Sequence, residues 1–509
     1  MSEPTLLHDL LDRAARRHPD APAVTSGPAT LTYRQLQAAS HRVADTLTRH
    51  GVRRGDRIVV RAGTDALLPA LVHGASRIGG VFALVHEQVR DEQLAHVLTD
   101  CEPRLLLADD ADAGRTAAAH RVPALPLRQL AGGGPDSAAV DGAGDAAPAG
   151  GAPLSVDPVC LIYTSGTTAL PKAVVSTHAQ VVFAAQAIQS RLSYRPTDTV
   201  YCPLPLSFDY GMYQVFLAAL GGSQVVLGAP AEAGPSLLAN LLSTGSTVLA
   251  AVPPVAEGLL RLLRRNPQRA PRLRLLTNTG STMPRWVLDG LRQLLPELRV
   301  QLMFGLTECK RVSIADPDED LRRPDTLGRP LPGTEVFAVD DGGRRLPPGE
   351  VGELVVRGPH VMAGYWRRPE LTAQRFQRED GLFPRLHTGD YGSVDAAGYI
   401  RFSGRRDDVY KQHGFRVSAV EVEAAARRVH GVEGAAVLPP DGDGRDAVLI
   451  VTGTADPAQV QQELRAHLED FKIPTRCLVL PSLPTSRTGK TDKKALRRLV
   501  DGQTDERAA

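Results

Sequence analysis

The alternation of β-branched runs with helical stretches is the feature that most constrains this fold. Residues 56–85 hold two such runs on either side of a helical segment, and the pattern returns at 246–263, 273–281 and 298–308. Strands that alternate with helices favour a parallel sheet, because a parallel connection needs a long crossover. The sequence therefore predicts layered α/β structure for most of the chain.

The pattern changes twice toward the C-terminus. From about Gly333, short strand-like runs alternate with turn residues, which is typical of a β-rich subdomain. After residues 404–408 a small tail begins, with its own helix near 456–471. Because a chain this long exceeds what one core usually supports, we expect two domains. The first, 1–405, is layered α/β with a β-rich subdomain, and the second, 406–509, is a small mobile α+β domain.

Charge and composition exclude several classes of protein. The formal net charge of +2 gives no reason to expect nucleic acid or an anionic membrane as a partner. No stretch approaches the roughly 20 apolar residues that a membrane span needs, and the first residues do not resemble a signal peptide. The five cysteines form neither CxxC pairs nor a disulfide framework. A cytoplasmic protein is the expectation.

Lysine is scarce in this chain. There are seven lysines against 52 arginines. Where a chain avoids lysine this strongly, the few that remain are candidates for positions that need a compact ammonium. The seven positions are Lys172, Lys310, Lys411, Lys472, Lys490, Lys493 and Lys494.

One of these lysines closes a segment rich in hydroxyl groups. Residues 161–174 read LIYTSGTTALPKAV, in which Gly166 permits a tight turn with exposed backbone N–H groups. Lys172 then supplies a cation for a phosphate. The segment is not a Walker A loop, since the spacing GxxxxGK[ST] is absent. Taken alone, it is equally compatible with a solvated turn between a strand and a helix.

Four further segments favour the phosphate-binding interpretation. Together with the first, and in the same order, they resemble the adenylate-forming superfamily of acyl-CoA synthetases, peptide-synthetase adenylation domains and luciferases. The resemblance covers nearly the whole chain. The further segments are FGLTE at Phe304–Glu308, HTGD at His387–Asp390, the hinge and loop at Gly404–Glu423 and the lysine motif at Pro484–Leu496.

The first segment departs from the family pattern at two positions. Ala169 and Ala173 stand where the family usually has glycine. Alanine makes a positive φ costly, so we expect the loop to retain phosphate binding with altered flexibility.

The resemblance implies a reaction and a set of residues for it. A carboxylate attacks the α-phosphorus of ATP, giving an acyl-adenylate and pyrophosphate, and the acyl group then passes to a thiol. Catalytic roles are implied for Lys172, Thr307, Glu308 and Lys490: Thr307 touches the α-phosphate, Glu308 ligates Mg²⁺, and Lys490 bridges the acid and the α-phosphate. The implied ATP-binding set comprises Thr164, Ser165, Gly166, Thr167, Thr168, Lys172, Gly280, Ser281, Phe304, Gly305, Thr307, Asp390 and Arg405.

The resemblance also implies movement of the small domain. Lys490 lies on that domain, so closure must bring it to the acid, with Asp407 as the matched hinge residue. After adenylation the loop from Lys411 to Gly414 is presented to the thiol. The thiol belongs to CoA or to the phosphopantetheine of a separate carrier protein.

The acid pocket is predicted from fewer residues. Asp209 stands where amino-acid-activating members keep an aspartate for the substrate amine, although a structural or capping aspartate is the alternative. Tyr210, Tyr213 and Met303 are further pocket candidates and suggest a small acid. Arg311, if it faces the pocket, pairs a second anionic group or a very small anion. Otherwise it and the adjacent lysine are surface charges.

Four functions stay open at this stage. The favoured one is activation of a small amino or amino-substituted carboxylic acid and its transfer to a separate carrier protein. The second is a CoA ligase for a small aliphatic or aryl acid. The third adenylates nitrite to diazotise an amine. The fourth, a non-catalytic ATP-binding relative, is disfavoured by the joint presence of Lys172, Glu308, Asp390 and Lys490.

Overall fold

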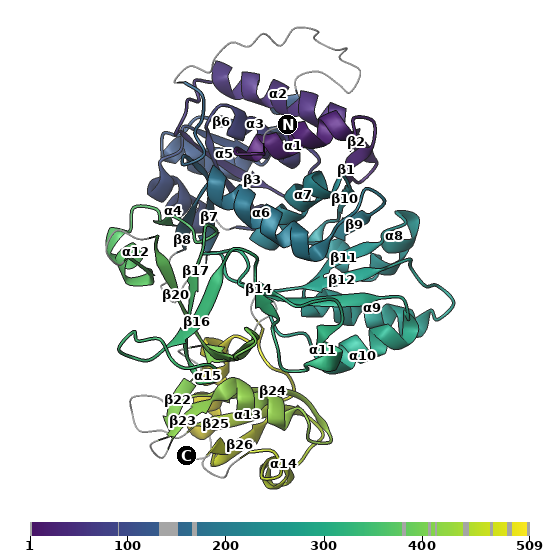
Figure 1. The fold of residues 1–509 in the computed structure, drawn as a ribbon, viewed down its shortest axis with the longest axis vertical. Helices are drawn as coiled ribbons and strands as arrows, with labels where there is room; N and C mark the ends of the chain where they lie inside the picture. The colour runs from purple at the N-terminus through teal and green to yellow at the C-terminus, as the bar shows by residue number, and fades with distance from the viewer. Residues whose placement is uncertain are drawn as a thin grey trace. The chain divides into compact units, whose positions relative to one another are not determined.

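The computed structural model separates the chain into two compact units (Figure 1). The first comprises Met1–Glu335 and Val356–His387, and the second comprises Val336–Val355 and Thr388–Ala509. The structure describes residues 3–89, 91–131, 151–164, 171–378, 383–405, 409–412, 415–440, 447–468, 472–485 and 491–505.

A seven-stranded sheet forms one part of the first unit. Its strand order is β18-β8-β7-β4-β3-β5-β6. The strands from β7 to β6 in that order run parallel, whereas β8 is antiparallel to β7 and β18 is antiparallel to β8. The strands are β3 (Arg57–Ala62), β4 (Val81–His86), β5 (Leu105–Ala108), β6 (Ala124–Leu125), β7 (Pro158–Thr164), β8 (Lys172–Thr177) and β18 (Gly364–Tyr365).

A nine-stranded sheet forms the other part. Its order is β15-β14-β13-β12-β11-β9-β10-β1-β2, and the six strands from β13 to β1 run parallel. The strands are β1 (Pro22–Ser26), β2 (Ala29–Thr32), β9 (Thr199–Cys202), β10 (Gln224–Leu227), β11 (Val248–Ala251), β12 (Leu275–Asn278), β13 (Arg299–Phe304), β14 (Ser313–Ile314) and β15 (Arg329–Pro330). The predicted α/β layering is therefore confirmed, including all the segments that the sequence pattern singled out.

Helices cover both sheets of the first unit. One apolar core joins α1, α2, α3, α6 and α7 to side chains from both sheets, and separate cores lie under α4 and α5 and under α8, α9 and α10. Helix α7 is buried almost throughout, as expected for a helix that is apolar all round. The helices are α1 (Leu7–Arg17), α2 (Tyr33–Arg49), α3 (Leu67–Arg77), α4 (Asp91–Cys101), α5 (Ala111–Ala119), α6 (His178–Leu192), α7 (Asp209–Gly221), α8 (Leu237–Ser243), α9 (Pro253–Arg265), α10 (Arg285–Leu294), α11 (Glu319–Arg322) and α12 (Pro369–Arg375).

The second unit is built mainly from short antiparallel strands. Strands β20 (Arg385–Val394) and β21 (Ile400–Arg405) form one antiparallel pair, and β22 (Val409–Gln412) and β23 (Phe415–Ser418) form another. A three-stranded sheet packs against helices in its own apolar cores. Its strands are β24 (Val432–Leu438), β25 (Val448–Gly453) and β26 (Arg476–Val479), and the helices are α13 (Ala419–Ala426), α14 (Pro457–Leu464) and α15 (Lys493–Asp505).

The predicted tail helix and the β-rich region are both present. Helix α14 begins after Asp456, whose side chain accepts hydrogen bonds from the backbone N–H groups of Ala458 and Gln459. Strands β16 (Glu335–Val339), β17 (Gly352–Arg357) and β19 (Phe376–Gln377) belong to the β-rich region. The division at residue 405 stays a prediction. No helix in the described part of the chain is long and apolar enough to cross a membrane.

Candidate active site

The hydroxyl-rich segment connects two antiparallel neighbours in the seven-stranded sheet. Thr164, the last residue of β7, lies opposite Lys172, the first residue of β8. The turn interpretation placed this segment between a strand and a helix, but it lies between two strands. Ala173 is buried within β8, so its methyl group occupies a regular strand position and not a strained turn. Residues 165–170, which include Ser165, Gly166, Thr167, Thr168 and Ala169, lie outside the described residues.

Lys172 and Glu308 contact the same tyrosine. The Tyr365 hydroxyl donates a 2.6 Å hydrogen bond to Glu308 Oε1. The ammonium nitrogen of Lys172 lies 4.1 Å from the centroid of the same ring, within the range of a cation–π interaction. Glu308 itself is buried. From the sequence, only the family resemblance placed the lysine and the glutamate in one site. Nothing in the sequence singled out the tyrosine.

Glu308 stands in a tight turn between β13 and β14. The Val312 N–H donates to the Phe304 carbonyl oxygen, 2.8 Å away, and so closes the turn. A Cβ atom at Gly305 would collide with the carbonyl oxygen of Lys310, so only glycine fits there. Lys310 itself has a φ of +64°, which is unusual for a residue with a side chain. Thr307 is half-buried in the same turn.

Three residues of the implied ATP-binding set lie at one edge of the nine-stranded sheet. Strands β12 and β13 are parallel, with Asn278 opposite Leu302, so their carboxyl ends meet at the same edge. Gly280 and Ser281 follow β12, and Phe304 ends β13. Gly280 has a φ of +89°, which glycine adopts without strain. The carboxyl edge of a parallel sheet is where nucleotides bind in many α/β folds.

The residues predicted at the ribose belong to the second unit. Asp390 on β20 lies directly opposite Arg405 on β21. Asp390 is buried, and its backbone N–H donates to Thr388 Oγ1 at 3.0 Å. Lys411 lies on β22, opposite Arg416 on β23. Three further predicted residues, Asp407, Gly414 and Lys490, lie outside the described residues.

The predicted acid pocket is a buried group of charges. Asp209 opens α7 and is 4% exposed, and Arg311 is also 4% exposed. Arg311 Nη1 lies 3.8 Å from Asp209 Oδ2, and the guanidinium carbon lies 5.0 Å from the centroid of the Tyr210 ring. The Tyr210 hydroxyl donates to the Thr277 carbonyl oxygen at 2.8 Å. Asp209 and Arg311 are therefore brought together, as the pocket prediction requires.

The surface alternative for the two cations is wrong. Lys310 is fully buried, and its Nζ has no hydrogen-bond partner among the residues that the structure describes. Within the same part of the chain, Arg311 Nε also has none, although Arg311 Nη1 donates to the Lys310 carbonyl oxygen at 2.5 Å. Burial lowers the pKa of the Lys310 ammonium, an effect that Asp209 and Glu308 oppose. A buried cation without a partner is a marker of function, because such burial is costly.

The two apolar pocket candidates are buried as well. Met303 lies on β13 opposite Ile314 of β14. Tyr213 lies one helical turn after Asp209 on α7, so the two side chains share a face. The Tyr213 hydroxyl has no hydrogen-bond partner in the described part of the chain.

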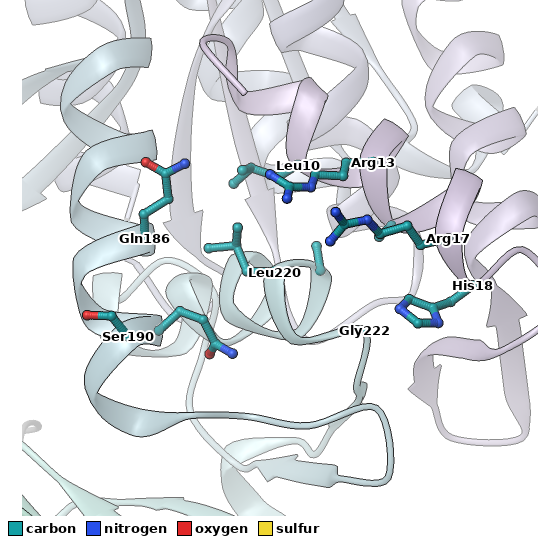
Figure 2. Close-up of a pocket in the computed structure, with 11 residues that line it drawn as sticks. Leu10, Arg13, Arg17, His18, Gln186, Ser190, Leu220 and Gly222 are labelled. Atoms are coloured by element: carbon teal, nitrogen blue, oxygen red, sulfur yellow. The ribbon is translucent and has the colours of Figure 1, made fainter. Parts of the chain in front are cut away.

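A separate pocket of about 260 Å³ lies among α1, α6 and α7. Figure 2 shows this pocket, which is lined by Arg13, Arg17 and His18 on one side and by Gln186 and Ser190 of α6 on the other. None of the residues predicted to bind ATP or the acid lines it. The pocket is therefore distinct from the candidate site.

Comparisons with known proteins identify relatives of this chain. The chain is 32% identical, over 96% of its length, to CymA of Salinispora arenicola, described as a probable non-canonical nonribosomal peptide synthetase. It spans only 6% of that relative's length. Among solved structures, the complex of VinN with L-aspartate is 38% identical, with a TM-score of 0.69, and covers 78% of this chain and 98% of VinN.

A third comparison covers nearly the whole chain. The ATP-bound structure of MatB from Rhodopseudomonas palustris is 25% identical, with a TM-score of 0.83, over 97% of this chain and 98% of MatB. The family model for AMP-binding enzymes matches residues 11–366, and the model for the C-terminal domain of AMP-binding enzymes matches residues 421–490. The chain therefore belongs to the AMP-binding family of adenylate-forming enzymes.

Proposed function

We propose that this protein activates a small amino acid that carries a second acidic group, forming its adenylate from ATP. The observation that carries the proposal is the buried cluster of Asp209, Lys310 and Arg311. Buried charges are costly unless opposite charges meet them. An ammonium group on the substrate would pair with Asp209, and a spare carboxylate would pair with the two cations.

The charges of this cluster and of such a substrate match. With both bases protonated, the three side chains carry a net charge of +1. An amino dicarboxylic acid carries one ammonium and two carboxylates, a net charge of −1. One carboxylate would meet the cations while the other reacts. An acid that lacks either charged group would leave a buried partner unpaired, which is the basis of strong discrimination.

Lys172 on β8, together with Thr307 and Glu308 in the turn, suits the binding of ATP and its metal ion. A carboxylate oxygen of the acid bonds to the α-phosphorus of ATP, and the bond from that phosphorus to the pyrophosphate oxygen breaks. Lys172 would hold the departing phosphates, and Thr307 would bond to the α-phosphate. The buried carboxylate of Glu308 is a hard oxygen ligand that suits Mg²⁺. When bound, Mg²⁺ neutralises charge that builds on the phosphate oxygens.

The remaining assignments rest on the family pattern. We assign Lys490 to the bridge between the acid and the α-phosphate, Asp407 to the hinge, and Asp390 with Arg405 to the ribose. The loop from Lys411 to Gly414 would then meet the thiol of a separate carrier protein or of CoA. The similarity to CymA, a probable peptide synthetase, supports a carrier protein as the partner.

The similarity to VinN supports the acid side of the proposal, since VinN has been solved with L-aspartate. The test is pyrophosphate exchange into ATP with L-aspartate, β-alanine and succinate. L-aspartate has all three charged groups, β-alanine lacks the spare carboxylate, and succinate lacks the amine. We expect exchange with L-aspartate to exceed that with either analogue by about 100-fold or more. Equal exchange with β-alanine would contradict the role of Lys310 and Arg311.

A second candidate function is adenylation of nitrite. The same buried cations favour it, because a very small anion would also satisfy them. Nitrite and an aromatic amine therefore belong in the same assay. AMP release that requires nitrite, with none for any amino acid, would replace the first proposal. No turnover with any acid, with ATP still bound, would support a non-catalytic relative.

A further inference from the structure

The pocket among α1, α6 and α7 is lined by positive charge without any negative charge. Arg13 and Arg17 belong to its lining, and none of the described residues that line it is an aspartate or a glutamate. We propose that this pocket is a second binding site of the protein, for a small molecule that carries a phosphate ester. The proposal does not rest on the adenylation reaction proposed above.

The two arginines have no partner within the protein. They lie one helical turn apart, so they share a face of α1 (Figure 2). Arg13 is half-buried and Arg17 is exposed, and neither guanidinium has an ion pair or a hydrogen bond among the described residues. Arg77, which is also half-buried, instead donates to Asp12 Oδ2 at 3.0 Å. The guanidinium groups of the pocket are therefore open to an anion.

The ends of two helices explain only part of this charge. Helix α1 ends at Arg17, and α7 ends beside Gly222, where the carbonyl ends of the helices favour cations. The ring of His18 covers that end of α7, since a Cβ atom at Gly222 would lie 2.6 Å from it. Arg13, however, stands before the last turn of α1, where the helix dipole has little effect.

The rest of the lining limits the class of ligand. A guanidinium group binds phosphate oxygens through two parallel hydrogen bonds, and a phosphate monoester carries a charge of about −1.5 to −2 at pH 7. Two arginines match that charge, whereas a lone carboxylate would match only one of them. Leu10 and Leu220 offer apolar surface to the organic part of the ester. The volume of about 260 Å³ restricts that part to a small group.

The pocket and the acid site lie at opposite ends of one helix. Helix α7 begins at Asp209 and reaches Gly221 over 13 residues. At 1.5 Å per residue, this length is roughly 20 Å. A ligand in the pocket should therefore not compete with the acid.

Binding of phenyl phosphate to the full chain tests the proposal. Isothermal titration calorimetry measures its affinity without ATP. We expect Arg13→Gln and Arg17→Gln each to weaken binding by about tenfold or more, because each removes a charge-assisted pair of hydrogen bonds. Pyrophosphate exchange by these variants should match that of the parent protein. No binding of phenyl phosphate to the parent protein would overturn the site and leave the proposed function untouched.

A matched control comes from the same helix. Arg16 is exposed in the last turn of α1 and does not line the pocket. Arg16→Gln changes the net charge equally, and we expect the affinity to stay within about twofold, because exposed charges are screened by salt. Equal weakening in all three variants would show a diffuse effect of charge and would overturn the site.

A further variant tests whether the probe binds at the ATP side instead. Lys172→Met removes the cation proposed for the phosphates of ATP. We expect it to leave the affinity for phenyl phosphate unchanged. Binding that is lost in this variant and retained in Arg13→Gln would place the probe at the ATP side, and the second site would be wrong.

Two simpler anions test the class of ligand. Benzoate keeps the ring with a single charge, and inorganic phosphate keeps the charge without the ring. We expect both to bind more weakly than phenyl phosphate. Equal affinity for benzoate would overturn the choice of a phosphate, and equal affinity for inorganic phosphate would overturn the apolar part. Arginine variants that only lower the melting temperature, with unchanged affinity, would assign the arginines to the helix ends alone.

Discussion

The two charged clusters of the first unit differ in how their charges are satisfied. On the ATP side, Lys172 and Glu308 each contact Tyr365. On the acid side, Lys310 Nζ and Arg311 Nε have no hydrogen-bond partner in the described part of the chain. The charges of the first cluster share one tyrosine, whereas two buried cationic nitrogens of the second have no hydrogen bond within the described residues. We infer that the first serves the step common to all acids and that the second selects among them.

Replacing Glu308, the proposed metal ligand, should reduce activity more than any other change in the first cluster. Glu308→Gln keeps an acceptor for the Tyr365 hydroxyl but loses the negative charge. We expect pyrophosphate exchange to fall by about 10³-fold with every acid, since metal stabilisation of charge contributes several kcal/mol. The assay uses saturating acid and varied Mg²⁺. A loss confined to one acid would mean that the two clusters are not separate in function.

Neutralising Asp209, the proposed partner of the substrate amine, should impair the second cluster and leave the first unchanged. For Asp209→Asn, we expect kcat/KM for an amino acid to fall by about 100-fold, because the substrate ammonium loses a buried carboxylate. The KM for ATP should stay within about twofold. A matched acid without the amine serves as the control and should lose far less. Equal losses for both acids would assign Asp209 a structural role.

Removing the charge of Lys310, whose Nζ has no hydrogen bond in the described part of the chain, should stabilise the free protein. Lys310→Met keeps the length of the side chain and the backbone conformation but removes the charge. We expect the free energy of unfolding to rise by about 1–2 kcal/mol while activity with a dicarboxylic amino acid is lost. Thermal unfolding without ligands measures the first effect. A lower melting temperature would show that the lysine is satisfied in the free protein, and the contrast between the clusters would disappear.

A buried histidine outside both clusters gives a prediction about the pH dependence of stability. His178 is buried, its Nδ1 accepts the Leu7 N–H at 3.1 Å, and burial lowers its pKa from 6.5 to about 4. The unfolded chain therefore binds a proton more readily between pH 6.5 and 4, so folded stability falls as the pH falls through this window.

We expect His178 to lower the free energy of unfolding by somewhat less than about 1 kcal/mol when the pH falls from 7.5 to 6. Urea unfolding at the two values measures the change. His178→Asn, whose amide oxygen accepts the same hydrogen bond, should lack this share of the pH dependence. An identical pH dependence in the variant would contradict the assignment.

Local patterns in the sequence predicted much of the fold and part of the site. The parallel α/β segments follow from hydrophobic periodicity, which each segment carries within itself. The motif that ends in Glu308 was found because its five residues are contiguous. For Lys310 the sequence leaves open a position that needs a compact ammonium or a surface charge, because a Lys-Arg pair is usually solvated. Its burial follows from the closure of the turn at Gly305, which depends on three-dimensional contacts.

Tyr365 was missed for a different reason. It lies 57 residues after Glu308, and its contact with that residue depends on the pairing of β18 with β8. Pairing between distant strands leaves no local signal in a single sequence. The grouping of Val336–Val355 with the C-terminal residues depends on distant contacts as well, and the boundary at residue 405 stays a prediction.

The turn from Gly305 to Arg311 has a consequence for how such a protein can diversify. Glu308, the proposed metal ligand, and the two cations of the proposed acid pocket lie within four consecutive residues that share one closed turn. An insertion there, or a larger residue at Gly305, would disturb catalysis and selectivity together. New acid preferences should therefore arise by substitution on α7, around Asp209 and Tyr213, where changes leave the metal ligand in place. We therefore expect selectivity to change through α7 while the turn stays constant.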